Sequence, residues 1–397
     1  MSRGTAAPRA NRNPGSQPAL RRQNTQRVLE TLAQGGPTTQ AKLARATGLS
    51  TGTISNIVKD LHAEHKIITR PVVDSGRRAI EISLNDSRTA VGLDIDATSM
   101  RMVLTHMDHA VISEVIAPLP FGHRPADTLR RARMLMDEHL DRAGIPRGDV
   151  IGVGVSLPTI LDHERKPLVH DPGFPEWFGN DLAALAGSTF TQPVHFENDA
   201  NVQALAHVTW GPYSLSSIVA TVKASSGIGA GLMVHGHIMR GAFGGTGEIG
   251  HLQIVPLGEL CHCGNRGCLQ TVASVDHVLA NIRRVKRLHD TPSIDDVVAL
   301  ARRRDPAALK VFDEAGRAIG TALASLVTLV NPHAIVISGP LAPVGSALLD
   351  PISRSMTRYA HPAIGPRTVV SMSQLGPRAE ALGAAALAAQ SAVAAAS

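Results

Sequence analysis

This chain of 397 residues lacks a long apolar run and has only three cysteines. A membrane-spanning helix needs about 20 consecutive apolar residues, and no run of about 18 occurs, so a transmembrane protein is not expected. The N-terminal residues also lack the apolar stretch of a secretory signal, which makes the cytoplasm the expected compartment. In a reducing cytoplasm, three thiols in one short segment favour a role other than a disulfide.

The apolar and charged fractions, 43% and 18%, are typical of a globular protein, and the length predicts two or three domains. The charge is unevenly distributed. Residues 1–88 hold 14 Lys and Arg against 6 Asp and Glu, whereas residues 89–397 hold 25 against 27. A basic module joined to a near-neutral body indicates a polyanionic partner, most often nucleic acid. A solvated basic face without a partner is the alternative.

Residues 1–20 are rich in Pro, Gly, Ser, Asn and Arg, which predicts a disordered basic tail. Residues 21–86 are predicted to form a winged helix-turn-helix domain. The expected helices span residues 24–34 from an Asn24 cap, 39–47, and 51–62 from a Ser50 cap. Gly48 can take the left-handed conformation that the turn between the second and third helices requires. Two strands flank residues 74–78, which are expected at the tip of a hairpin wing.

This pattern predicts DNA binding, with the third helix in the major groove and the wing on phosphates or in the minor groove. Short polar side chains near the start of such a helix suit contacts with base edges and phosphates. The candidate DNA-contacting residues are Ser50, Thr51, Thr53, Ser55, Asn56 and Lys59 on the helix and Arg77 and Arg78 on the wing. A helical bundle that binds other proteins is the alternative reading.

From Ala90 onwards, β-type runs alternate with helical stretches, which indicates a layered α/β fold. The helical stretches cover residues 126–143, 293–329 and 379–395. The runs include a strand–turn–strand–turn–strand unit that begins at Ala90 and a strand–glycine turn–strand unit around SSGIGAG.

Four motifs in order, FENDAN, SSGIGAG, GGTGEIGHLQI and CHCGNRGC, resemble the ROK family of repressors, open reading frames and kinases. That family is similar to bacterial glucokinases and has a two-lobed, actin-like (ribonuclease-H-like) architecture. The resemblance implies an α/β chain in which the winged helix-turn-helix precedes a ROK sugar-kinase domain at residues 89–397. Its small lobe would cover about residues 89–200 plus the C-terminal helix, and its large lobe about residues 201–375.

The cysteines form a glycine-rich turn in which three thiolates can converge: Cys261, Cys263 and Cys268. A tetrahedral Zn²⁺ site needs a fourth ligand, and His251 fits in composition and matches the histidine of the family. His262 is a competing candidate, although neighbouring residues rarely reach one ion together. Four protein ligands leave no open position, so we expect a structural zinc ion.

The resemblance also implies a sugar pocket that contains Asn198, Asp199, Glu248 and His251, whose polar groups suit vicinal hydroxyls. In a kinase, Asp199 would take the proton from the attacking hydroxyl, and here it is expected to be a vestigial base. Where kinases have Glu in the zinc turn, this chain has Gln270, which keeps hydrogen bonding and loses the charge. We expect Gln270 to contact the sugar as well.

The nucleotide side departs from the kinases of the family, whose first phosphate loop reads DxGGT. Asp96 and Ala97 stand where that loop has its glycines, so a negative charge and two Cβ atoms oppose a polyphosphate. In the second loop, Ser225 and Ser226 replace a glycine and a threonine. Phosphoryl transfer depends on such loops, so we expect negligible kinase activity.

These observations predict a sequence-specific DNA-binding transcription regulator, a repressor of sugar-metabolism genes, whose kinase-like domain senses a sugar or sugar derivative. Operator DNA and a sugar are the expected partners, and two-fold operators imply a homodimer or a tetramer. An ATP-dependent, glucokinase-like sugar kinase with a regulatory DNA-binding head is the enzyme alternative. A DNA-binding protein controlled only through protein partners is a third possibility.

Overall fold

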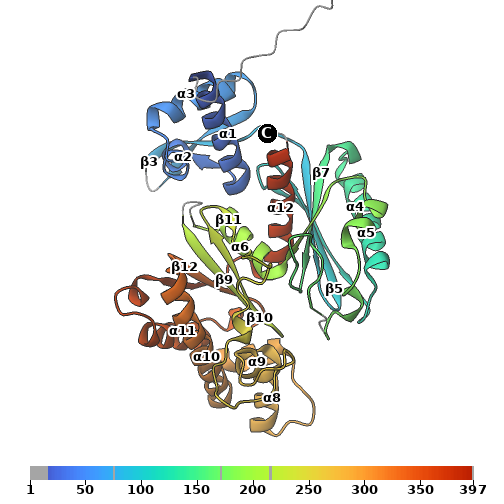
Figure 1. Cartoon of the computed structure of the whole chain (residues 1–397), viewed down its shortest axis with the longest axis vertical. Coiled ribbons are helices and arrows are strands. Elements are labelled where there is room, and N and C mark those ends of the chain that lie inside the picture. Colours follow the sequence, from blue (N-terminus) through green and yellow to red (C-terminus); the bar gives the residue numbers. More distant parts are fainter. Residues whose placement is uncertain (1–16, 75–76, 170–171, 214–216, 396–397) are drawn as a thin grey trace, which may run out of the picture.

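The structure, a computed structural model, describes residues 17–74, 77–169, 172–213 and 217–395. A head of residues 17–86 lies at one end, and a body of residues 89–395 forms two lobes beneath it (Figure 1). Residues 1–16 of the predicted basic tail and the tip of the predicted wing at residues 75–76 lie outside the described residues. In the described part of the chain, no helix is long and apolar enough to cross a membrane.

The head consists of three helices and a small antiparallel sheet in the order β1-β3-β2. Its helices are α1 (Gln17–Gly35), α2 (Gln40–Thr47) and α3 (Thr51–Ala63), and its strands are β1 (Thr38–Thr39), β2 (Ile67–Asp74) and β3 (Arg77–Leu84). The corner between α2 and α3 matches the predicted one, because Gly48 has φ 70° and the Ser50 hydroxyl accepts the Thr53 amide at 3.1 Å. Val28, Leu43 and Ile54 form the core between these helices.

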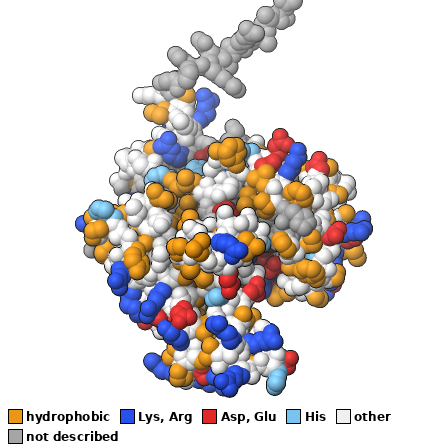
Figure 2. Space-filling view, turned by 60° about the horizontal axis from the view of Figure 1, so that its bottom comes forward, with side chains coloured by type: hydrophobic (Ala, Val, Ile, Leu, Met, Phe, Trp, Pro, Cys, Tyr) orange, Lys and Arg blue, Asp and Glu red, His pale blue; other side chains and the backbone are white. Residues whose placement is uncertain are grey.

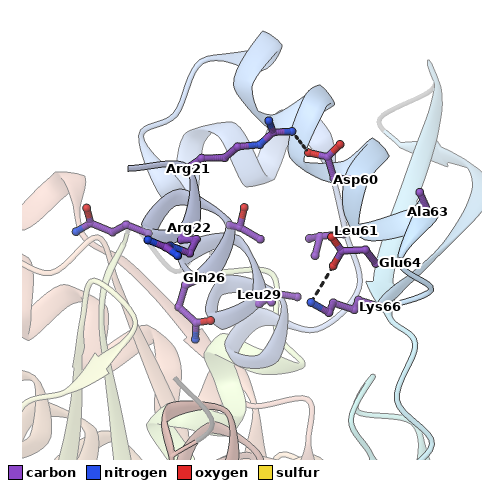
Figure 3. A pocket seen from close by; sticks show the side chains of 11 residues that line it. Arg21, Arg22, Gln26, Leu29, Asp60, Leu61, Ala63, Glu64 and Lys66 are labelled. Carbon is purple, nitrogen blue, oxygen red and sulfur yellow. Dashed lines mark hydrogen bonds and ion pairs between the residues drawn. The ribbon is translucent and has the colours of Figure 1, made fainter. Parts of the chain in front are cut away.

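The start of α1 differs from the prediction. The helix begins at Gln17, so Asn24 lies inside it and does not cap it. Residues 19–22, ALRR, are strong helix formers, which explains the extension beyond the expected start. Arg21 also forms an ion pair with Asp60 of α3 beside a groove between the two helices (Figure 3). Because both side chains reach solvent, water screens this ion pair and it adds little to stability.

The small lobe is built on a five-stranded sheet in the order β6-β5-β4-β7-β8. Its strands are β4 (Thr89–Ile95), β5 (Ser99–His106), β6 (Val111–Pro118), β7 (Val150–Leu157) and β8 (Val194–Asn198). The first three strands form the predicted antiparallel unit, and β7 and β8 add in parallel. Helices α4 (Pro125–Ala143) and α5 (Leu182–Thr189) cover one face of this sheet, and the C-terminal helix α12 (Ala379–Ala395) covers the other (Figure 1).

The large lobe is built on a second sheet in the order β11-β10-β9-β12-β13. Its strands are β9 (Ile218–Ala224), β10 (Ile228–Val234), β11 (His237–Ile238), β12 (Ala334–Ser338) and β13 (Val369–Met372). Its helices are α6 (Asp199–Thr209), α7 (Gln270–Ala273), α8 (Val275–Lys286), α9 (Ile294–Arg302), α10 (Pro306–Val330) and α11 (Ser346–Tyr359). The stretch predicted as helical over residues 293–329 is interrupted, because Asp305 caps a new helix at Pro306, whose nitrogen carries no hydrogen.

Helices α6 and α12 lie between the two sheets and hold the lobes together (Figure 1). The close approach of α12 to the strand β7 and to α6 requires residues without a Cβ atom. A Cβ on Gly154 of β7 would lie 1.8 Å from the Ala384 carbonyl oxygen of α12. A Cβ on Gly383 of α12 would lie 1.8 Å from the Val202 carbonyl oxygen of α6. The Ala-rich sequence of α12 therefore matches a helix that is buried on several sides.

Candidate functional sites

A cavity of about 200 Å³ lies between the lobes, and all five predicted sugar-binding residues line it. These residues are Asn198, Asp199, Glu248, His251 and Gln270. The two from FENDAN lie where β8 ends and α6 begins. The Asn198 side chain caps α6 by accepting the Ala200 amide at 3.0 Å, and its amide nitrogen donates to the Thr159 carbonyl at 3.1 Å. Asp199 is the first residue of α6, where a helix N-terminus favours its negative charge.

Glu248 and His251 reach the cavity from the cap and the last residue of a single 3-10 turn, Ile249–His251. The Glu248 Oε2 lies 3.9 Å from the His251 Nε2. Burial, together with the negative charge of Asp199, raises the pKa of Glu248 to about 7. At neutral pH this carboxyl group can therefore both donate and accept hydrogen bonds, which suits a hydroxyl-rich ligand.

Sequence reasoning missed a buried lysine at the base of the cavity. Lys223 of β9 places its Nζ 2.6 Å from the Asp199 Oδ2 and 3.3 Å from the Glu380 Oε1 of α12. Burial opposes the charge, but the carboxylates of Asp199 and Glu380 outweigh it and raise the pKa of Lys223 well above its usual value. The available signal was the one charged residue in the largely buried strand IVATVKA. Such a residue needs buried carboxylate partners.

Asp94 extends this charge cluster towards the small lobe. Its Oδ1 accepts the Ser156 hydroxyl at 2.9 Å, and burial followed by the charge of Glu380 raises the pKa of Asp94 well above its usual value.

The two loops that hold nucleotide phosphates in kinases border the same cavity. The carboxylate of Asp96 accepts the backbone amide of Ala97 at 2.8 Å. An amide in this loop is thus already bound to a negative charge of the protein. Ser225 and Ser226 line the opposite side. Asp96 and Ala97, the residues that depart from the first phosphate loop of kinases, therefore line the same cavity as the predicted sugar-binding residues.

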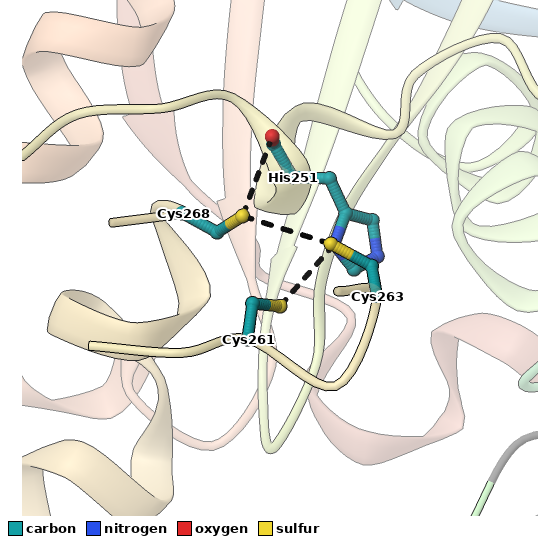
Figure 4. A group of neighbouring side chains, drawn as sticks. All are labelled: His251, Cys261, Cys263 and Cys268. Carbon is teal, nitrogen blue, oxygen red and sulfur yellow. Dashed lines mark hydrogen bonds between the residues drawn. The ribbon is translucent and has the colours of Figure 1, made fainter. Parts of the chain in front are cut away.

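The three cysteines and His251 form one cluster whose ligand atoms all lie within 4.8 Å of one another (Figure 4). The Cys263 and Cys268 sulfurs are 3.8 Å apart, and the Cys261 sulfur is 3.6 Å from the His251 Nδ1. A tetrahedral ion with Zn–S bonds of about 2.3 Å and Zn–N bonds of about 2.0 Å requires separations of about 3.8 and about 3.6 Å. The donor set and its spacing therefore fit zinc.

His262, the competing ligand candidate, lies outside this cluster, with its ring 5.3 Å from the His251 ring in an edge-on contact. Gln270 joins the cluster to the cavity, because its side-chain amide donates to the Cys261 sulfur at 3.2 Å. Burial and the neighbouring thiols raise the pKa of Cys268 to about 12. A thiolate at this position needs a cation, as metal binding provides.

The predicted DNA-contacting residues lie on α3, on the residue that caps it and on β3. Those exposed on or next to α3 are Ser50, Thr51, Ser55, Asn56 and Lys59, while Thr53 is half-buried against Ser50. Arg78 is exposed on β3, opposite Val73 of β2. Arg77 lies on the same strand, and its side chain lies outside the described part of the structure. On the face of the molecule in Figure 2, Lys and Arg side chains of the body are mixed with Asp and Glu.

A family model described as the ROK family matches residues 90–391. The chain belongs to the ROK family. A second model, described as a winged helix-turn-helix that binds DNA, matches residues 21–68. The predicted fold, a winged helix-turn-helix followed by a two-lobed ROK body, is therefore confirmed.

Relatives of two kinds are similar to this ROK chain. The xylose repressor of Bacillus spizizenii is 26% identical over 367 residues, 92% of this chain and 94% of the repressor. The glucokinase of Thermotoga maritima is 28% identical over 309 residues, 75% of this chain and 96% of the enzyme. A solved ROK family transcriptional regulator, a homologue of the Escherichia coli MLC protein, has a TM-score of 0.74 at 24% identity and covers 94% of this chain and 98% of its own.

Proposed function

We propose that this ROK protein is a sequence-specific DNA-binding repressor of sugar-metabolism genes whose body binds a sugar or sugar derivative. The similarity to the xylose repressor extends over the head as well as the body, whereas the similarity to the glucokinase covers about the length of the body. The cavity between the lobes brings together five polar residues at a volume that suits a monosaccharide. The head supplies an exposed helix surface suited to the major groove.

We further propose that the body does not phosphorylate its sugar. The observation that carries this step is the ion pair between Lys223 and Asp199. A general base must be free to contact the attacking hydroxyl, and the Asp199 carboxylate is instead bound to the Lys223 ammonium at 2.6 Å. Asp96 adds a negative charge where a polyphosphate would lie, and its carboxylate already holds the Ala97 amide.

The alternative is an ATP-dependent sugar kinase with a DNA-binding head. Asp199 is present, and Gly227 and Gly229 keep part of the second phosphate loop. The similarity to a glucokinase over three quarters of the chain supports this reading. A coupled assay for ADP release with glucose, xylose and N-acetylglucosamine decides between the two. Turnover of about 1 s⁻¹, which lies within the ordinary range of enzymes, would refute our proposal and favour the sugar kinase.

The Cys261–Cys263–Cys268–His251 cluster is proposed to hold a structural zinc ion. Bound zinc would supply no chemistry to a reaction, because four protein ligands leave no open coordination position. Its role would be to fix the turn that carries Glu248 and the ligand His251 at the cavity wall. Loss of the metal would then weaken sugar binding as well as stability.

The working protein is proposed to be a homodimer or tetramer that acts on operator DNA in the cytoplasm, since two-fold operators match two-fold proteins. We assign residues 21–86 to DNA binding and residues 89–397 to sugar sensing. Fluorescence anisotropy with labelled duplexes that the purified protein selects from a random library tests the DNA-binding part. Equal affinity for selected and scrambled duplexes would refute it.

A further inference from the structure

Helix α6 runs from the sugar cavity to the DNA-binding head. Its first residue, Asp199, lines the cavity, and its last residue, Thr209, donates its hydroxyl to the Gln34 carbonyl of α1 at 2.9 Å. Eleven helical residues span about 16 Å. One rigid element therefore has its two ends in the two proposed binding regions.

The body also holds the end of α1 through a second contact. The Nε2 of His109, in the turn after β5, lies 2.9 Å from the Ala33 carbonyl oxygen. Trp210, which follows α6, donates its indole N–H to the His109 carbonyl at 3.1 Å, and the two rings pack edge-on at 5.0 Å. The last carbonyls of a helix have no partner within it. Here side chains of the body bind two such carbonyls of the head.

Helix α12 follows a parallel route. Near its start, Glu380 contacts the Lys223 ammonium that also holds Asp199. Towards its end, Ala388 and Ala389 share a hydrophobic cluster with Val28 of α1. Both helices thus extend from one buried ion-pair cluster to the head, and Gly383 keeps them in direct contact.

We propose that α6 and α12 carry the state of the sugar site to the DNA-binding head, with Thr209 and Trp210 as positioning residues at the junction. This inference rests on the proposed function. A sugar hydroxyl that binds Asp199 competes with Lys223 for the same carboxylate, and this competition shifts α6 relative to α12. Because packed helices can slide past one another while each stays rigid, the shift reaches Gln34 and Ala33 and reorients the head.

The first test measures coupling between sugar and DNA in the full-length protein. Anisotropy gives DNA affinity with and without saturating glucose, xylose or N-acetylglucosamine, and their ratio is the coupling factor. In the double variant Thr209→Val, Trp210→Phe, both hydrogen bonds are lost while an apolar group remains at each position, and we expect the factor to fall at least fivefold. The control Thr189→Val removes a hydroxyl that bonds within α5, and we expect this variant to keep the coupling factor of the wild-type protein.

A wild-type coupling factor in the double variant would overturn the inference while leaving the proposed function intact. The absence of any sugar effect in the wild-type protein would instead count against the proposed function.

A second test needs no sugar. The effects of Asp199→Asn and Thr209→Val on DNA affinity are measured singly and together. Sites separated by about 16 Å along a helix ordinarily act independently. We expect the combined effect to depart from the product of the single effects by at least threefold. Agreement with that product within about 1.5-fold, including the case in which neither variant changes DNA affinity, would refute the inference.

Discussion

The Nζ of Lys223 lies 2.6 Å from the Oδ2 of Asp199, and this contact brings the sugar pocket and the buried charges of the body into one cluster. Lys223 compensates a carboxylate that a kinase would need as a free base. The same lysine contacts Glu380 of α12 at 3.3 Å. The same lysine therefore links the first residue of α6 to Glu380 of α12 through one ion-pair cluster.

The first prediction concerns sugar binding. Asp199→Asn removes the charged acceptor at the start of α6 and should weaken the affinity for the sugar by about 10- to 100-fold, because hydrogen bonds to charged groups contribute about 1.5–3 kcal/mol. Isothermal titration calorimetry with glucose, xylose and N-acetylglucosamine measures this change. Asp350→Asn, on the exposed side of α11, is the matched control and should bind as the wild type does. Equal sugar affinity in both variants would show that Asp199 does not bind the sugar.

The second prediction concerns the metal. The purified wild-type protein should contain about one zinc ion per chain, since the four residues form a single tetrahedral site. Cys263→Ser should lose most of this zinc and lower the thermal midpoint. His262→Ala changes the neighbouring residue, which lies outside the cluster, and should retain the metal. Elemental analysis by mass spectrometry compares the three proteins, and negligible zinc in all of them would contradict the proposal.

The third prediction separates the two kinds of DNA contact on α3. Asn56→Ala should cost about 1–3 kcal/mol and relax the sequence preference at one base pair, as expected for a base-reading side chain. Lys59→Ala should weaken binding to all sequences and reduce the salt dependence by about one counterion. Lys66→Ala is the control, because Lys66 pairs with Glu64 beyond the end of α3. Anisotropy titrations at several salt concentrations measure the DNA affinity of each variant. The same affinity and the same salt dependence in all three variants would contradict the prediction.

The fourth prediction concerns the junction between head and body. Burial lowers the pKa of His109 to about 4, although the Ala33 carbonyl and the neighbouring Asp108 favour protonation. Between pH 4 and about 6.5 the native state then binds fewer protons than the unfolded state. The free energy of unfolding is therefore not reduced by His109 above pH 6.5, and it declines as the pH falls towards 4. Protonation would also place a second N–H on a buried ring whose Nδ1 has no partner among the described residues.

His109→Gln keeps an N–H donor for the Ala33 carbonyl and does not titrate. Between pH 7.5 and 5.5, the wild type should lose about 1 kcal/mol of stability more than this variant, while the other histidines cancel. Denaturant unfolding at both pH values measures the difference. Parallel pH profiles of the two proteins would show that His109 does not carry this dependence.

Local chemistry made the head and the metal cluster predictable. Gly48 and Ser50 are the residue types that a turn and a helix cap demand, and three cysteines in eight positions leave few alternatives to convergence. The start of α1 at Gln17 was not predictable from a cap at Asn24, because a contact from Arg21 to the distant Asp60 accompanies the extension.

Long-range contacts could not be predicted from the sequence, for a different reason. Lys223 and Glu380 are far apart in the chain, and only the packing of α12 against both lobes brings them together. The contact of His109 with Ala33 depends on how the head rests on the body, which no local sequence pattern indicates. Such contacts depend on the arrangement of whole domains and not on local pattern.

The central claim is that the body senses a sugar without phosphorylating it and that the head is its output. The most direct measurement follows DNA anisotropy and ADP release in one sample that contains protein, selected duplex, ATP and each sugar of the panel in turn. We predict that one sugar releases the duplex while ADP stays at the level of the protein-free control. ADP production at about 1 s⁻¹ with the duplex still bound would contradict the account.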